Sequence, residues 1–158
     1  MNKIIVGILT FLVWIMPWFT PLYTELQRRT FDENVIWSAV VQHVENHDAA
    51  ALAAMSRPWL KNNVSDLTGK ITALLDAIDG NIEGVAVLPD SYPNYYEGVR
   101  SVGRMLGILT DADEAYTLRV VYEYTNVHDR NEIGIARLQL IRGINGRVLA
   151  DIKTPQYK

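Results

Sequence analysis

The sequence contains no cysteine, and this absence removes several kinds of chemistry at once. Disulfide bonds, thiolate catalysis, zinc sites with cysteine ligands and an acylated lipoprotein terminus are all excluded. The chain also lacks a phosphate-binding glycine loop, a dinucleotide fingerprint and a G-x-S-x-G nucleophile motif. We therefore expect no cofactor and no bound metal.

Clusters of basic residues are also missing. The chain has 15 Lys and Arg against 18 Asp and Glu, a formal net charge of -3, and its only basic doublet is Arg28-Arg29. Without a basic patch it has no electrostatic footprint for nucleic acid. With 158 residues, 49% of them hydrophobic and 21% charged, the chain suits a single globular domain.

One long apolar run is present at the N-terminus. Residues 4–19 carry no charge, and the apolar character continues to Tyr23. About 20 helical residues span roughly 30 Å, the thickness of the hydrocarbon core of a bilayer. Trp18 and Tyr23 stand where an interfacial aromatic belt would lie. The run predicts an uncleaved membrane anchor over residues 1–24, with a lipid bilayer as partner through residues 4–23.

Two alternatives for this run stay open, a cleaved signal peptide and a buried core helix. The exit sequence WFTPLYTE has no small-x-small cleavage site, which disfavours cleavage. The orientation rests on opposing signals. Arg28 and Arg29 favour a cytoplasmic domain by the positive-inside rule, whereas the short N-terminal tail with Lys3 favours export of the C-terminal domain. We expect a single-pass protein of the inner (cytoplasmic) membrane with an extracytoplasmic, periplasmic domain.

After a polar joint over residues 25–34, three segments have helical patterns. Residues 35–47 place apolar side chains on one face, and the alanine-rich segment from Asp48 is expected to stop at Arg57-Pro58. Residues 65–79 repeat apolar positions at a spacing of three and four, with Ser65 or Asp66 as the N-terminal cap and Gly80 after the end.

The pattern then changes to alternation, which indicates strands. In residues 117–125 Leu118, Val120, Tyr122 and Tyr124 alternate with the residues between them, and residues 132–143 change parity between Ile135 and Leu138, which predicts a β-bulge. Residues 143–146 supply a hairpin turn before residues 147–153, and residues 99–109 are expected to start the sheet. The prediction is an α+β fold, with a transmembrane helix and then two or three helices packed on a bent antiparallel sheet of three to four strands.

This order of elements resembles the cystatin-like and NTF2-like folds. The resemblance rests on residues 35–47, the junction NHDAAALAAM from Asn46 to Met55, and the segments RVVYEYT and ARLQLIRGINGRVLADI. It covers roughly residues 33–155 and is similar to small bacterial proteins in which such a domain follows a signal sequence or anchor. The resemblance implies a domain over residues 35–158 whose curled sheet wraps a helix around a cone-shaped pocket. Some members of these folds are isomerases or dehydratases, and others only bind or assemble.

Two histidines four residues apart, His43 and His47, have a spacing that metal ligands use. The string is H-x-E-x-H rather than H-E-x-x-H, so Glu45 points away from the pair and a third ligand is missing. We expect the histidines at the edge of a pocket, with no metal. Asp48 is expected to cap the next helix by accepting hydrogen bonds from the backbone near Ala51.

The other candidate pocket residues are aromatic. Trp37, Tyr122 and Tyr124, together with the two histidines, are the possible lining of the cone. An acid–base role would need a perturbed pKa, and packing in the core is the plainer interpretation for alternating tyrosines. The segment TDADEA, residues 110–115, lacks the glycine and the terminal glutamate of a calcium loop and is expected to form an exposed hairpin turn.

A candidate contact surface comes after the helices. Residues 87–98, VLPDSYPNYYEG, contain Tyr92, Tyr95 and Tyr96 with two prolines. We interpret them as an aromatic loop between helices and sheet, because tyrosine-rich loops bury area at low entropy cost. The partner would be another protein or a second copy of the chain; packing of these tyrosines over the sheet edge is the alternative.

No motif names a reaction. The leading hypothesis is an extracytoplasmic binding or assembly domain that is not catalytic. One alternative is a small pocket enzyme of the isomerase or hydrolase kind, and another is a component of an envelope or secretion complex.

Overall fold

The computed structural model describes residues 33–96, 98–129, 131–143 and 146–155, without the side chains of residues 90, 91 and 96. Two compact units divide the chain, residues 1–38 and residues 39–158. Of the first unit only residues 33–38 are described, as the beginning of a helix that continues to Glu45. The second unit contains every other element below.

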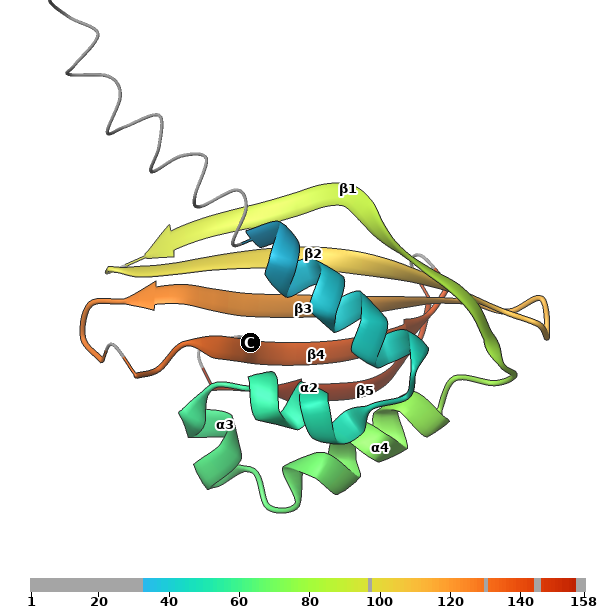
Figure 1. The fold of residues 1–158 in the computed structure, drawn as a ribbon, viewed down its shortest axis with the longest axis horizontal. Coiled ribbons are helices and arrows are strands. Elements are labelled where there is room, and N and C mark those ends of the chain that lie inside the picture. Colours follow the sequence, from blue (N-terminus) through green and yellow to red (C-terminus); the bar gives the residue numbers. More distant parts are fainter. Residues whose placement is uncertain (1–32, 97, 130, 144–145, 156–158) are drawn as a thin grey trace, which may run out of the picture. The chain divides into compact units, whose positions relative to one another are not determined.

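The core of the second unit is a five-stranded antiparallel sheet in the order β1-β2-β3-β4-β5 (Figure 1). Each strand pairs with the next one along the chain, so the sheet is a continuous meander. The strands are β1 (Ile82–Tyr96), β2 (Val99–Thr110), β3 (Ala115–Asn126), β4 (Gly134–Arg142) and β5 (Val148–Lys153). Because every connection is a hairpin, β1 and β5 are the two edges.

Three short helices pack against one side of this sheet: α2 (Ala49–Met55), α3 (Pro58–Asn63) and α4 (Leu67–Asp76) (Figure 1). Helix α2 packs on α4 and contacts β4, and α4 also contacts β5. Many of their apolar side chains are buried, as are those of the strands that face them. The most buried of these are Leu52, Leu60, Ile71, Leu74, Leu75, Leu106, Ile108, Leu118, Ile135, Leu138 and Leu140.

Alternation along each strand separates two faces of the sheet. On β3, Leu118 and Val120 are fully buried toward the helices, whereas Arg119 and Val121 point the other way and are partly exposed. We call the face opposite the helices the open face. By the register of the strands it carries Gly103, Gly107, Leu109, Thr117, Arg119, Val121, Arg137, Gln139, Asp151 and Lys153.

The prediction for the start of α2 is confirmed. Asp48 is its N-terminal cap, and Oδ1 accepts a hydrogen bond from Ala51 N at 2.9 Å. Asp66 caps α4 in the same way, and Gly80 follows that helix with φ of +82°. Residues 46 and 47 form the turn before the cap.

Replacing Asp48 by alanine is expected to lower the free energy of unfolding by about 1 kcal/mol, because one N–H in the first turn of α2 loses its acceptor. Asp48→Asn keeps a side-chain oxygen in the same place and should retain most of that stability. Urea denaturation of the three proteins measures the difference. An asparagine variant as unstable as the alanine variant would show that the cap is not the cause.

The fold-class prediction is wrong in its number of strands. The sheet has five strands rather than three or four, since residues 82–96 form a strand where a loop was expected. Pro89 and Pro93 suggested that loop, but a proline is tolerated on an edge strand, whose N–H groups need no partner on one side. The pairing with β2 shifts register between Val87 and Ser91, which accommodates this segment.

The same prediction included a transmembrane helix at the N-terminus. None of the helices in the described part of the chain is long and apolar enough to cross a membrane. The predicted anchor, residues 1–24, and most of the predicted joint, residues 25–34, lie outside the described residues.

Two smaller features complete the comparison. Arg57-Pro58 ends α2 as expected, but Pro58 also starts α3, since proline fits the first position of a helix. The predicted bulge is present: Val121 pairs with Arg137 and Tyr122 with Ile135, so Ala136 has no partner on β3. The strong twist at a bulge gives the sheet its bend.

Candidate functional site

A groove of about 480 Å³ lies along β1, β2 and β3, mainly on the open face of the sheet. Its walls are almost entirely apolar, and its exposed position makes it accessible from solvent. Leu109 is 53% exposed although it is a large hydrophobic side chain. The lining residues are Gly84, Val85, Ala86, Leu88, Gly107, Ile108, Leu109, Ala115, Tyr116, Thr117 and Gly143. We call this the apolar groove.

Missing side chains create this hollow. At Gly84 no atom of the described residues lies within 4 Å of the place where a Cβ would be, and the same holds at Gly143. A Cβ on Gly107 would stand 3.3 Å from Leu88 Cδ2. Glycine inside a strand weakens that strand. Here Gly84 on β1 and Gly107 on β2 leave a floor without side chains, which larger residues would fill.

A second groove, of about 330 Å³, lies farther along the same strands. It is lined by Tyr92, Asn94, Ser101, Gly103, Arg119 and Val121, and we call it the polar groove. Arg119 of this groove and Thr117 of the apolar groove are two residues apart on the same face of β3. That separation is roughly 7 Å along a strand. The two grooves therefore follow each other along one face.

Arg119 is the one charged residue among the described side chains that line these two grooves. Its Nη1 donates only a long hydrogen bond, 3.5 Å, to Gln139 Oε1, and within the described part of the chain no carboxylate is paired with it. Arg137 on the same face differs, because its Nε and Nη2 each donate to Asp151 at 2.9 Å. The guanidinium of Arg119 is therefore the available cation of this surface.

The surroundings of Arg119 are positive. Lys153 Nζ also contacts Asp151, at 3.2 Å, so three cations share the open face with one carboxylate across these neighbouring positions. Burial opposes ionisation of Asp151, but hydrogen bonds from Arg137 and Lys153 outweigh it and hold its pKa below the usual value. The carboxylate stays charged at neutral pH and is already shared by two cations, which leaves Arg119 without a counter-ion among the described residues.

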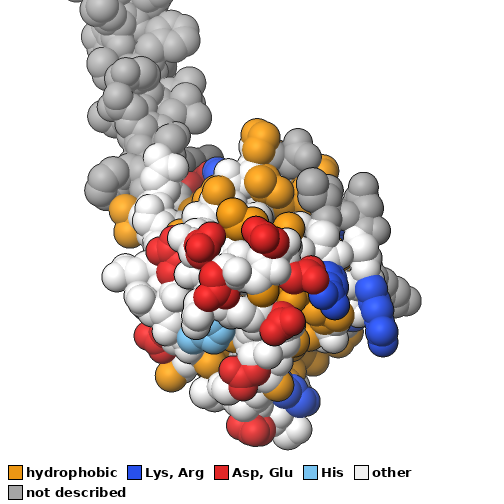
Figure 2. All heavy atoms as spheres, turned by 90° about the vertical axis from the view of Figure 1, so that its right-hand side faces the viewer, with side chains coloured by type: hydrophobic (Ala, Val, Ile, Leu, Met, Phe, Trp, Pro, Cys, Tyr) orange, Lys and Arg blue, Asp and Glu red, His pale blue; other side chains and the backbone are white. Residues whose placement is uncertain are grey.

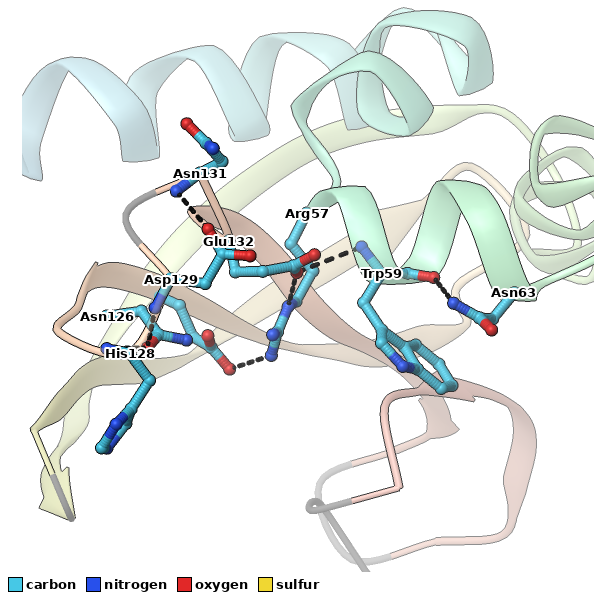
Figure 3. A network of polar contacts seen from close by, with 9 residues as sticks. Arg57, Trp59, Asn63, Asn126, His128, Asp129, Asn131 and Glu132 are labelled. Atoms are coloured by element: carbon cyan, nitrogen blue, oxygen red, sulfur yellow. Dashed lines mark hydrogen bonds and ion pairs between the residues drawn. The ribbon is translucent and has the colours of Figure 1, made fainter.

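A different polar cluster is buried where the start of α3 and the connection between β3 and β4 meet β3 (Figure 3). Arg57 Nη1 donates to Glu123 Oε1 at 2.6 Å, and Arg57 Nε donates to Glu132 Oε2 at 2.7 Å. Trp59 N also donates to Glu132, at 3.1 Å. Arg57 is 5% and Glu123 0% exposed. We call the three charged residues, Arg57, Glu123 and Glu132, the buried ion cluster.

The path of the backbone explains how Arg57 reaches β3. Ser56 forms a parallel bridge with Ile135, and Arg57 N donates to Ile135 O at 3.0 Å, so this junction runs beside the start of β4. Gly134 has no side chain there, and a Cβ would stand 2.5 Å from Met55 O. The cluster is enclosed by its own partners, and we assign it to stability rather than to ligand binding.

The connection that carries Glu132 is held by its own polar side chains (Figure 3). Asn126 Oδ1 accepts from the backbone N–H groups of His128 and Asp129, at 3.0 Å and 3.1 Å, and Asp129 Oδ1 accepts from Asn131 N at 3.0 Å. These bonds order the chain between β3 and β4, so that Glu132 meets Arg57.

The structure separates the two histidines that were expected at a pocket edge. The helix ends at Glu45, and His47 is an exposed turn residue with φ of +51°. His43 remains helical, is 27% exposed, and has its Nδ1 3.5 Å from Asp48 Oδ2. The four-residue spacing gives a common face only within one helix, and this helix ends at Glu45, before His47. Neither histidine lines the two grooves.

The expected aromatic lining is packed instead of open. The rings of Tyr122 and Tyr124 lie 4.9 Å apart between centroids, and the Arg100 guanidinium lies 5.4 Å from the Tyr124 centroid. Burial raises the pKa of the Tyr122 phenol, so it offers no phenolate at neutral pH. Trp37 is 2% exposed, in the helix of residues 33–45.

The three tyrosines expected on one loop are divided by strand geometry. Tyr92 pairs with Gly103 and Tyr95 with Arg100, positions of opposite parity on β2, so the two side chains point to opposite faces. They are 59% and 71% exposed, and only Tyr92 lines a groove. Tyr96 belongs to β1, but its side chain is outside the described residues.

Carboxylates gather at the end of the domain where the turn between β2 and β3 lies (Figure 2). Asp111 and Asp113 are exposed in this turn, as its sequence predicted. Hydrogen bonds from Asn81 lower the pKa of Asp111, and a hydrogen bond from Arg142 lowers that of Glu114. In the described ranges no group of three metal-ligating side chains occurs.

Sequence reasoning missed both the grooves and the buried ion cluster. One signal was present: Gly103 and Gly107 are four residues apart on a strand and therefore open the same face. Their weak strand propensity obscured that meaning. Nothing in the local sequence links Arg57 to Glu123, which is 66 residues away.

Comparison with known proteins gives one result. No curated protein matches this chain. The resemblance to cystatin-like and NTF2-like folds stays a prediction. A family model described as "Domain of unknown function (DUF5104)" matches residues 39–143, which span β1 to β4 and the helices before them. That match covers more than half of the chain, and the protein therefore belongs to the DUF5104 family.

Proposed function

We propose that this domain is a non-catalytic binding domain, and that its ligand lies in the apolar groove on the open face. The observation that carries the proposal is an apolar hollow of about 480 Å³ whose glycine floor is open to solvent. Ligand sites are typically concave and mostly apolar, in the range of roughly 300–1,000 Å³. An exposed strand face without such a purpose would more often carry polar side chains.

The arrangement of titratable groups supports binding rather than catalysis. A general acid or base needs a titratable side chain close to the reacting group. The apolar groove offers only the Tyr116 phenol and the Thr117 hydroxyl among its lining side chains. Tyr116 is 3% exposed, and its hydroxyl accepts a hydrogen bond from Asp79 N at 3.0 Å. Thr117 donates to Gly143 O. Both groups already have structural partners.

The test uses the full-length protein and Nile red, an uncharged dye that fluoresces in apolar sites. We expect saturable binding, weakened at least about tenfold by Leu109→Asp, because burying a carboxylate in an apolar contact is unfavourable. Leu109 is 53% exposed, so this substitution should leave the free energy of unfolding nearly unchanged.

Leu149→Asp is the matched control. Leu149 is also an exposed leucine on a strand, 38% exposed on β5, and does not line the groove. It makes the same chemical change at another place on the sheet. Equal dye binding by wild type and both variants would disprove a site in this groove.

A further inference from the structure

We infer that the ligand is an aliphatic monocarboxylate, with its carboxylate at Arg119 and its alkyl chain in the apolar groove. This inference rests on the proposed function and adds the chemical class of the ligand. It is based on the order of two features on one face: a cation with no carboxylate partner among the described residues at one end, and a long apolar hollow at the other.

The head group is assigned from Arg119. A guanidinium binds a carboxylate through two parallel N–H donors, and partial burial strengthens such a pair relative to water. Arg119 is partly buried, and its hydrogen bond to Gln139 is long, at 3.5 Å. Asn94 and Ser101 line the same groove and provide further polar groups beside it.

Comparison with Arg137 shows what is missing at Arg119. Both guanidiniums lie on the open face of adjacent strands, and Asp151 satisfies Arg137 with two hydrogen bonds of 2.9 Å. A carboxylate bound at Arg119 would complete the equivalent pair. Arg119 is the one charged side chain among the described residues that line the two grooves, and a single cation there favours a monoanion over a dianion.

The tail is assigned from the apolar groove. Between Arg119 and Ala115 the strand rises roughly 13 Å, so an extended alkyl chain can follow β2 and β3 over the glycine floor. Small polar anions would leave this surface in contact with water. A neutral alkane would leave Arg119 without a counter-ion, so an amphiphile satisfies both parts.

The distribution of charged residues supports a negatively charged ligand. The chain has a net charge of -3, yet Arg119, Arg137 and Lys153 share the open face with Asp151 as the one counter-ion that the described residues supply there. A negative ligand is therefore attracted to a positive region of an otherwise acidic protein.

The experiment titrates the full-length protein by calorimetry with decanoate below its micellar concentration. Decanol and decyltrimethylammonium replace the head group, and acetate and octanoate shorten the tail. We expect decanoate to bind one-to-one, at least about tenfold more tightly than decanol. Acetate should not bind measurably, and each methylene removed should weaken binding by up to about fourfold.

Variants locate the two halves of the ligand. Arg119→Gln should lower decanoate affinity at least about tenfold and leave Nile red binding unchanged, because it removes only the charge. Arg119→Lys should retain part of the decanoate affinity. Arg137→Gln is the matched control and should change affinity less than about threefold, since Arg137 already has a partner.

The outcomes separate this inference from the proposed function. Equal affinity for decanoate and decanol, or none for decanoate while Nile red still binds, would overturn the ligand class but keep the groove as a binding site. If Leu109→Asp weakened the binding of neither decanoate nor Nile red, the groove would be disproved as the binding site. The head-group series on wild-type protein decides the inference even where Arg119→Gln does not fold.

Discussion

Arg57→Ala is expected to lower the free energy of unfolding by about 3–5 kcal/mol, the largest effect of any single substitution proposed for this chain. The side chain holds Glu123 at 2.6 Å and Glu132 at 2.7 Å, and Glu123 has no exposure to solvent. Removing Arg57 takes the guanidinium away from the buried Glu123 carboxylate, which remains charged inside the protein. Urea denaturation monitored by circular dichroism measures the loss.

Arg142→Ala is the matched control for this prediction. Arg142 is paired with Glu114, but the two side chains are 53% and 34% exposed, and solvent-exposed ion pairs contribute about 0–1 kcal/mol. Adding Glu123→Gln to Arg57→Ala should recover part of the lost stability, because it removes the negative charge from a fully buried side chain. Similar small losses for Arg57→Ala and Arg142→Ala would contradict the structural role of the buried ion cluster.

Gly134→Ala is expected to lower the free energy of unfolding by about 3 kcal/mol or more. The causes are backbone strain and loss of the adjacent hydrogen bond from Arg57 N to Ile135 O. Gly134 has φ of +134°, a conformation that residues with a Cβ rarely adopt. An added Cβ would stand 2.5 Å from Met55 O and 2.8 Å from Arg57 N. Both are backbone atoms, so the junction between α2 and α3 must move away from β4.

Gly84→Ala provides the comparison within the same sheet. No described atom lies within 4 Å of its added Cβ, and we expect a change of less than about 1 kcal/mol. Gly134→Ala and Arg57→Ala should also be non-additive in a double-mutant cycle, because both separate the same junction from β4. Additive losses would indicate that the glycine and the ion cluster act independently.

The candidate site could be predicted only in part. The glycines of β2 and the position of Arg119 on alternating β3 are visible in the sequence, and together they define one face. This face is open because the helices pack on the other side of the sheet, and no local sequence pattern predicts on which side they pack. The composition of the tyrosine-rich segment predicted a contact loop, but the alternation of a strand places Tyr92 and Tyr95 on opposite faces of the sheet.

The sequence by itself determined the local features of this protein. Asp48 and Asp66 cap their helices, alternation marks β3, and the parity change in β4 produces a bulge, because each depends on neighbouring residues alone. Only the tertiary structure decided that residues 82–96 form an edge strand. Pairing with β2 on one side supplies their backbone hydrogen bonds, and an edge strand tolerates the two prolines in this segment. The tertiary structure likewise brought Arg57 to Glu123 and, within the described residues, left Arg119 without a carboxylate. Those pairings depend on strand register and helix packing, which join residues far apart in the chain.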